Sequence, residues 1–137
     1  MTDNMNRQQR PVRERILVID DSPVIREMLV EILTDDGYVV DTAEDGEKGA
    51  MKALAGDYAV ILCDVHMPRQ NGLDTVREIM ATRPSARIIM TDSLPDRLAQ
   101  SAREEGALCC LQKPFDVTEL RELISRIKTG RPVTRGG

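Results

Sequence analysis

Short apolar runs alternate with longer amphipathic segments along this chain, and this alternation constrains the fold more than any other feature. The runs predict strands at residues 15–20, 38–42, 59–63, 87–90 and 107–112. Most are apolar throughout rather than alternating with polar residues, which is typical of strands buried on both faces of a parallel sheet. We therefore expect an α/β fold in which five helices cover both faces of a five-stranded parallel sheet.

Capping residues predict where the helices begin and end. The first helix is expected to start at Ser22 and Pro23, a cap residue followed by proline in the first turn. Its apolar residues recur at helical spacing, and Gly37 is placed to end it. The second and third helices are expected to follow Asp45-Gly46 and Asn71-Gly72. The fourth and fifth are expected to begin near Pro95 and near Thr118.

Composition excludes several classes of protein. The length of 137 residues suits one domain. A net charge of −4 gives no electrostatic footprint for nucleic acid. No segment approaches the ~20 apolar residues of a membrane span, and the polar N-terminus does not resemble a secretory signal. We expect a soluble, cytoplasmic protein with no nucleic acid or membrane partner.

The three cysteines are interpreted as structural residues. Cys63, Cys109 and Cys110 all lie inside expected strands, where a free thiol behaves as a small hydrophobic group. The chain has one histidine and no CxxC spacing, so we do not expect a zinc site.

Polar residues suited to phosphoryl chemistry follow four of the expected strands. Asp20-Asp21, Asp64, Thr91 and Lys113 stand at these positions. Because the carboxyl ends of parallel strands form one edge of a sheet, we expect these side chains to meet there. Two carboxylates ~4 Å apart repel by about 4 kcal/mol at an effective dielectric constant of ~20, and a divalent cation can offset this. Any one aspartate is equally well explained as a cap or turn residue, but the three together favour a Mg²⁺ site.

The same residues can accept a phosphoryl group. A carboxylate oxygen can serve as the nucleophile and give an aspartyl phosphate. Catalysis of phosphoryl transfer consists mostly of positioning and of neutralising charge. Lys113 supplies a compact positive charge and Thr91 a short hydroxyl for the phosphoryl oxygens.

Together these motifs resemble the receiver domain of two-component response regulators. They are Asp20-Asp21-Ser22-Pro23, Asp64 with Met67-Pro68 and Asn71-Gly72, Thr91, and Lys113-Pro114-Phe115. The resemblance covers residues 13–128. We expect residues 1–12 and 129–137 to be flexible tails. It implies a doubly wound, flavodoxin-like sheet of strand order 2-1-3-4-5.

The resemblance also implies a role for each site residue. Asp64 would be the phosphorylated residue, and Thr91 and Lys113 would contact the phosphoryl group. Asp21 and Asp64 would bind Mg²⁺ directly, and Asp20 largely through a water molecule. The backbone carbonyl of His66 would be the remaining protein ligand.

Partners follow from the same resemblance. A histidine kinase or phosphotransfer protein would supply the phosphate, and the domain would catalyse this transfer and its own slow dephosphorylation without being a metabolic enzyme. The output would be binding of a downstream protein through the fourth helix, fifth strand and fifth helix, or onward transfer in a phosphorelay. We expect a monomer or weak homodimer. Because no output module follows in the sequence, we expect a stand-alone receiver or a piece of a longer protein.

Three residues depart from the pattern of the family. Asp92 follows Thr91 where a small residue is usual, so its carboxylate is expected either to slow phosphorylation or to turn outward as a helix cap. Cys110 replaces a usual aromatic residue, which puts the family's coupled movement of threonine and ring in doubt. His66 lies two positions after Asp64 and is expected to be a solvent-facing loop residue.

Other functions stay open at this point. The main alternative is a degenerate receiver that binds partners without being phosphorylated. An enzyme of the haloacid-dehalogenase kind would need a second aspartate where His66 stands. A flavin-binding domain would need a phosphate-cradling loop where the acidic Asp20-Asp21 stands.

Overall fold

A single parallel sheet forms the centre of the molecule. The computed structural model describes residues 13–68, 70–93 and 97–129. The strands are β1 (Arg15–Ile19), β2 (Val39–Ala43), β3 (Val60–Asp64), β4 (Ile88–Asp92) and β5 (Cys109–Gln112). They are all parallel and lie in the order β2-β1-β3-β4-β5. This confirms the expected doubly wound topology.

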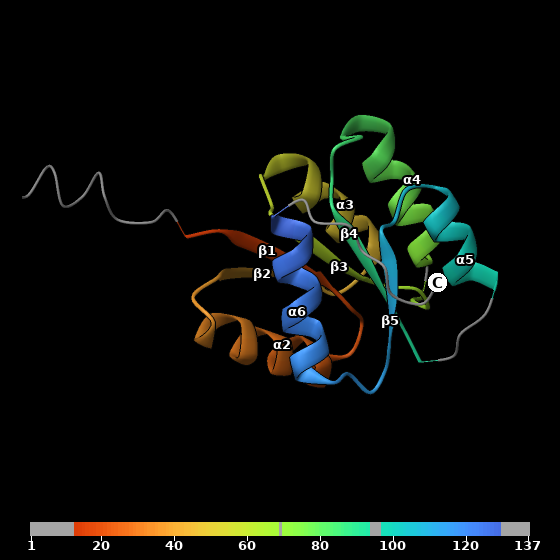
Figure 1. The fold of residues 1–137 in the computed structure, drawn as a ribbon. Coiled ribbons are helices and arrows are strands. Elements are labelled where there is room, and N and C mark those ends of the chain that lie inside the picture. Colours follow the sequence, from red (N-terminus) through yellow and green to blue (C-terminus); the bar gives the residue numbers. More distant parts are fainter. Residues whose placement is uncertain (1–12, 69, 94–96, 130–137) are drawn as a thin grey trace, which may run out of the picture.

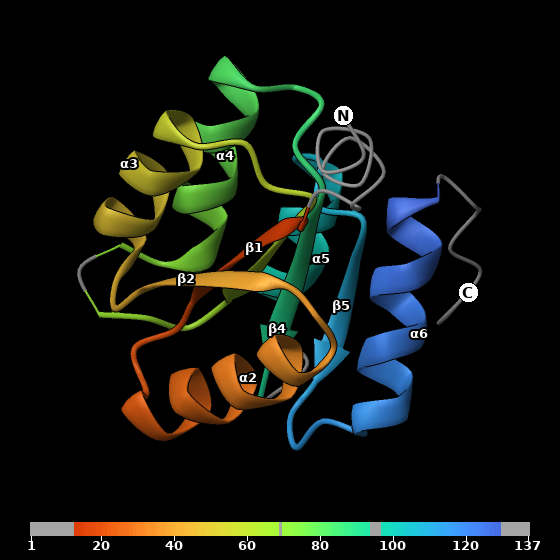
Figure 2. The ribbon, with the colours of Figure 1, turned by 90° about the vertical axis from the view of Figure 1, so that its left-hand side faces the viewer.

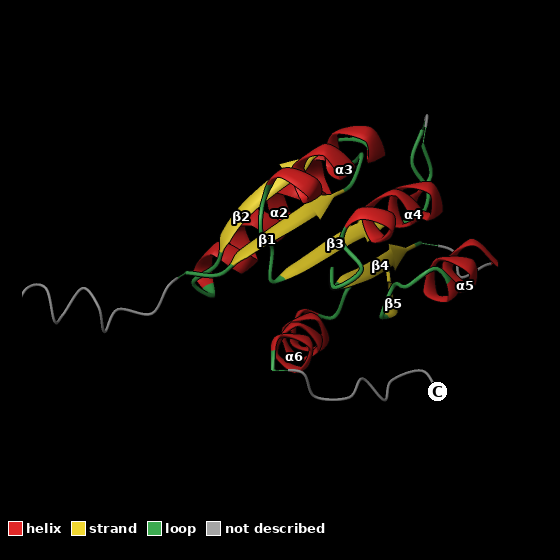
Figure 3. Cartoon of the chain, turned by 90° about the horizontal axis from the view of Figure 1, so that it is seen from above, coloured by secondary structure: helices red, strands yellow, loops and turns green. Residues whose placement is uncertain are grey.

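Helices cover both faces of this sheet (Figures 1 and 3). They are α2 (Pro23–Asp35), α3 (Gly46–Ala55), α4 (Gly72–Thr82), α5 (Arg97–Glu104) and α6 (Val117–Lys128). The helices α2 and α6 pack on one face and contribute to one buried apolar cluster. The helices α3, α4 and α5 pack on the opposite face and contribute to a second cluster. Figure 2 shows α3 and α4 on one side of the strands and α2 and α6 on the other.

Side-chain caps fix the starts of four helices at the carboxyl edge of the sheet. The Ser22 hydroxyl accepts a hydrogen bond from the Ile25 amide, and Pro23 is the first helical residue, as expected. The side chains of Asp45, Asn71 and Asp116 cap α3, α4 and α6 in the same way. The expected start of α5 near Pro95 and most of the two expected tails lie outside the described residues.

The strands differ from expectation mainly at their carboxyl ends. β3 extends through Asp64 and β4 through Asp92, because the ladder pairs Asp64 with Thr91 and Asp92 with Gln112. β5 begins at Cys109 rather than at residue 107, since the Ala107 amide bonds to the Ala102 carbonyl and closes the end of α5 instead. Several site residues are therefore held by the sheet itself and not by the loops that follow it.

The cysteines pack as apolar residues. Cys63 and Cys109 are buried on opposite faces of the sheet, and Cys110 packs against the cluster that contains Cys63. Burial, followed by the nearby charges of Asp64 and Asp20, raises the pKa of the Cys63 thiol far above its ordinary value. Across the described part of the chain, no helix combines the length and apolar character needed to cross a membrane.

Candidate phosphoryl-accepting site

The sheet gathers the predicted site residues at one edge. Ile19 of β1 pairs with Cys63 of β3, so Asp20 and Asp64 follow at neighbouring positions. Thr91 of β4 pairs with Asp64, and the Lys113 amide donates a hydrogen bond to the Asp92 carbonyl, 2.7 Å away. The four strand ends thus place the predicted residues side by side.

Three carboxylates form the acidic part of the site. One oxygen each from Asp20, Asp21 and Asp64 lies within 4.8 Å of the others. Asp20 and Asp64 are buried, whereas Asp21 is exposed. The Asp20 side chain is fixed by the Ser22 amide, which donates to Oδ1 at 2.9 Å. This donor set consists only of oxygens, which is the kind that Mg²⁺ prefers.

Lys113 partly neutralises this cluster. Its Nζ lies 2.8 Å from Asp20 Oδ2 and 3.4 Å from Asp64 Oδ1. Burial lowers the pKa of Lys113, but its hydrogen bond to Asp20 and the charges of Asp20 and Asp64 outweigh this, so the pKa is raised. The ammonium is therefore charged at neutral pH. The peptide bond between Lys113 and Pro114 is cis.

Asp64 retains an unfavourable environment for its charge despite Lys113. Burial, and after it the charge of Asp20, raises the pKa of Asp64 to about 6, while Lys113 opposes both effects. A positive charge added beside Asp64 would relieve this. The pKa therefore indicates a position where a cation is favoured.

A hollow of about 620 Å³ opens over these side chains. Its lining is formed by Asp20, Asp21, Ser22, Ile25, Asp64, His66, Ser93, Lys113 and Pro114. The sequence analysis gave no role in the site to Ser22, Ile25, Ser93 or Pro114. Thr91 is buried and does not contribute to the lining, although it neighbours Asp64 in the sheet.

Arg26 is a further residue that the sequence analysis missed. Its Nη1 donates a hydrogen bond to the Asp20 carbonyl at 2.7 Å. The signal for it was its position in α2, one helical turn after Ser22, which places it near the end of β1.

Of the two alternatives expected for Asp92 the outward turn is wrong, whereas His66 is an exposed loop residue, as expected. The Asp92 side chain does not turn outward, since Asp92 is only 1% exposed. Its Oδ1 lies 3.5 Å from Nε2 of His66, whose side chain is 43% exposed. His66 thus lies in an exposed loop at the rim of the hollow, as expected, with its ring beside the buried carboxylate of Asp92.

Comparison with known proteins agrees with this arrangement. The family model for the response regulator receiver domain matches residues 16–125. The chemotaxis protein CheY of Thermotoga maritima is 30% identical over 116 residues, which cover 83% of this chain and 97% of that protein. The transcriptional regulatory protein PdtaR of Mycobacterium tuberculosis is 34% identical over 110 residues, which cover 80% of this chain.

Some relatives are much longer than this chain. It spans 54% of PdtaR and 38% of a protein-glutamate methylesterase/protein-glutamine glutaminase of Symbiobacterium thermophilum, with which it shares 36% identity over 140 residues covering 94% of this chain. The activities of those longer proteins are not assigned to this chain by the match.

Solved structures show the same fold. CheY4 of Vibrio cholerae superposes with a TM-score of 0.79 at 31% identity, covering 85% of this chain and 99% of that one. TrrA of Thermotoga maritima, solved in complex with Mg(2+)-BeF, superposes with a TM-score of 0.74 at 35% identity, covering 83% and 98%. With the family match spanning nearly all of the described residues, this chain belongs to the response regulator receiver domain family, whose members act as phosphorylation-based signalling switches.

Proposed function

We propose that this protein is switched by Mg²⁺-dependent transfer of a phosphoryl group from a histidine kinase or phosphotransfer protein to Asp64. The observation that carries the proposal is the convergence of three carboxylates within 4.8 Å, with the Lys113 ammonium at ion-pair distance from Asp20 and Asp64. This arrangement offers a nucleophile, a cation site and a fixed positive charge in one hollow.

The acidic residues fit the ion that the proposal requires. Asp21 and Asp64 would bind Mg²⁺ directly, Asp20 through water, and the His66 carbonyl would complete the protein ligands. Bound there, Mg²⁺ would neutralise charge on the transferring group. TrrA, which is 35% identical to this chain, forms a complex with Mg(2+)-BeF, and this supports the binding of Mg²⁺ by a receiver domain of the same fold.

Three residues would have separate roles in the phosphoryl transfer. An Asp64 carboxylate oxygen forms the new bond to phosphorus while the bond from phosphorus to the donor histidine nitrogen breaks, and the nitrogen keeps the electron pair. Lys113 holds a positive charge beside the phosphoryl oxygens, and the Thr91 hydroxyl donates to one of them. The work is positioning and neutralisation, as expected for phosphoryl transfer.

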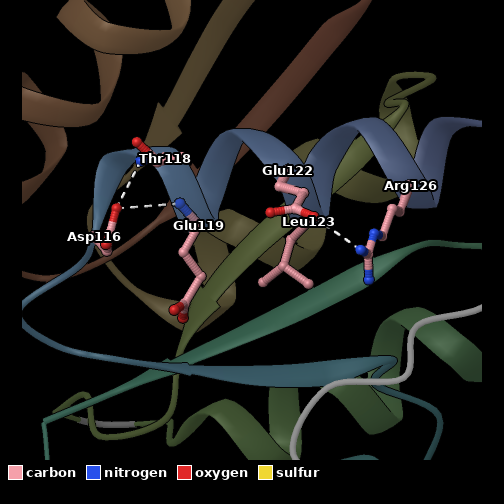
Figure 4. Close-up of a pocket in the computed structure, with 6 residues that line it drawn as sticks. All are labelled: Asp116, Thr118, Glu119, Glu122, Leu123 and Arg126. Atoms are coloured by element: carbon pink, nitrogen blue, oxygen red, sulfur yellow. Dashed lines mark hydrogen bonds and ion pairs between the residues drawn. The ribbon is translucent and has the colours of Figure 1, made fainter.

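The output surface is proposed to lie on α5, β5 and α6. A shallow hollow of about 320 Å³ on α6 belongs to this surface (Figure 4) and is lined by Asp116, Thr118, Glu119, Glu122, Leu123 and Arg126. Asp116 is occupied as the cap of α6, and Glu122 pairs with Arg126 at 2.8 Å. We propose that phosphorylation changes binding of a downstream protein here, with the protein a monomer or weak homodimer.

The proposal is tested by phosphorylating the purified protein with acetyl phosphate and following its intact mass. We expect one acid-stable, base-labile phosphoryl group that requires Mg²⁺ and that is lost in Asp64→Asn. Peptide mapping should place it on Asp64. A protein that stays unmodified would instead be a degenerate receiver, the alternative that Asp92 and Cys110 motivate.

A further inference from the structure

The contact between His66 and Asp92 joins two segments across the rim of the hollow. His66 lies in the connection between β3 and α4, and Asp92 is the last residue of β4. The Nε2 to Oδ1 distance is 3.5 Å. His66 also lines the hollow that contains Asp64, so this contact lies at the opening of the site.

Asp92 is the rigid partner in this contact. It is 1% exposed and pairs with Gln112 in the β4–β5 ladder. Its carbonyl accepts a hydrogen bond from the Lys113 amide at 2.7 Å. The His66 side chain, in contrast, is 43% exposed and stands on a connecting segment. The sheet thus holds the carboxylate in place beside the more exposed imidazole ring.

We propose that Asp92 is a positioning residue that holds the imidazole of His66 across the entrance to Asp64, so that their contact slows the entry of both the phosphodonor and the hydrolysing water. This inference rests on the proposed function, because it concerns access to the phosphorylated residue. It assigns to Asp92 a role that depends on His66 and not on the carboxylate charge alone.

A different role for Asp92 makes different predictions. If its charge simply repelled an anionic donor, removing the charge would speed phosphorylation whatever residue stood at position 66. Hydrolysis of the aspartyl phosphate by neutral water would change little. A restrained ring, in contrast, obstructs small molecules of any charge, so both rates depend on it.

A double-mutant cycle separates the two roles. The proteins are the wild type, His66→Ala, Asp92→Ala and the double variant, each phosphorylated with acetyl phosphate and Mg²⁺ and then freed of donor to follow hydrolysis. We expect each single variant to raise the rate of phosphorylation and the rate of hydrolysis by ~3-fold or more, which corresponds to an interaction energy typical of residues in contact. The double variant should show no further increase in either rate. The backbone carbonyl of His66 is kept in every variant.

Asp92→Asn is the matched control. Asparagine keeps the shape and an acceptor oxygen for the imidazole N–H but carries no charge. We expect its two rates to stay near those of the wild type, whereas repulsion by charge predicts that it matches Asp92→Ala. Melting temperatures of all variants identify any loss of folding, and Asp92→Asn gives the answer even where Asp92→Ala unfolds.

The outcomes distinguish failure of this inference from failure of the proposed function. Additive effects in the cycle, unchanged hydrolysis, or equal rates for Asp92→Asn and Asp92→Ala would overturn the positioning role while leaving phosphorylation of Asp64 intact. A wild-type protein that accepts no phosphoryl group would overturn both.

Discussion

Lys113 is the residue on which the charge balance of the site depends. It is 14% exposed and lies between the buried carboxylates of Asp20 and Asp64. Removing one partner of such a buried group leaves the other charges uncompensated, which costs more than the ion pair itself contributes. The same ammonium also competes with any cation for those carboxylates.

We predict that Lys113→Gln lowers the free energy of unfolding by about 3 kcal/mol at neutral pH without divalent ions. Saturating Mg²⁺ should restore part of the loss, because the ion then neutralises the same carboxylates. Urea unfolding with and without Mg²⁺ measures both effects. Lys48→Gln is the control, since Lys48 makes an exposed pair with Glu44 and such pairs contribute at most about 1 kcal/mol. Equal losses in the two variants would contradict this account of Lys113.

At the scale of elements, the start of α4 packs closely against the end of β3, which carries Asp64. Gly72 begins α4, and its amide donates to the Val65 carbonyl at 2.7 Å. A Cβ at position 72 would lie 2.4 Å from the Asp64 carbonyl oxygen and 2.8 Å from Val65 Cα. Both are backbone atoms of the strand end that carries Asp64, so any relief would displace the site.

We predict that Gly72→Ala destabilises the protein by about 2 kcal/mol or more and also slows phosphorylation of Asp64. Thermal unfolding and the acetyl phosphate reaction measure the two effects. Gly37→Ala serves as the control: its φ of +96° makes alanine costly by about 1–2 kcal/mol, but no atom lies within 4 Å of its Cβ and it stands at the far end of α2. Slower phosphorylation in both variants would show that lost stability, and not displacement of Asp64, is responsible.

At the scale of the whole molecule, the site makes stability depend on pH and on cations. The pKa of Asp64 is raised to about 6 in the folded protein, so the unfolded chain ionises first as pH rises. Ionisation of Asp64 therefore weakens the fold progressively between about pH 4 and pH 6, and the loss is complete above that range. At ~1.4 kcal/mol per pKa unit, the loss at pH 7 is about 3 kcal/mol.

We predict that Asp64→Asn escapes this loss. In the absence of Mg²⁺, the stability of Asp64→Asn relative to the wild type should increase by about 3 kcal/mol of unfolding free energy between pH 4 and pH 7. Mg²⁺ should narrow the difference at pH 7, because it binds the folded wild type more strongly than the variant. Urea unfolding across this pH range measures the difference. A difference that is constant with pH would mean that the Asp64 carboxylate is not strained in the fold.

Much of this architecture is encoded in local signals, and the rest depends on long-range contacts. Apolar runs and cap residues such as Ser22 and Asp45 predicted the strands, and the starts of α2, α3, α4 and α6, to within about two residues. The strand order came only from the resemblance to a family, because alternation does not fix which strands are neighbours. The extension of β3 through Asp64 depends on its ladder partner Thr91, and no local pattern shows that.

The candidate site shows the same division. Asp20, Asp21, Asp64 and Lys113 were predictable because each follows an apolar run, and the structure brings them together. The contact of His66 with Asp92 was not predictable, since it depends on how the connection from β3 to α4 approaches the end of β4. Sequence reasoning treated these two residues separately for that reason.

Titration of the protein with Mg²⁺ by isothermal calorimetry at pH 7 tests the central claim most directly, namely that the ends of β1 and β3 form one cation-binding, phosphoryl-accepting pocket. The matched variant is Asp21→Asn, because Asp21 is exposed and its replacement leaves the buried residues in place. We expect one Mg²⁺ to bind the wild type, with affinity at least about tenfold weaker in Asp21→Asn, a loss of ~1.4 kcal/mol. Absence of binding to the wild type, or equal affinity in the two proteins, would contradict the account.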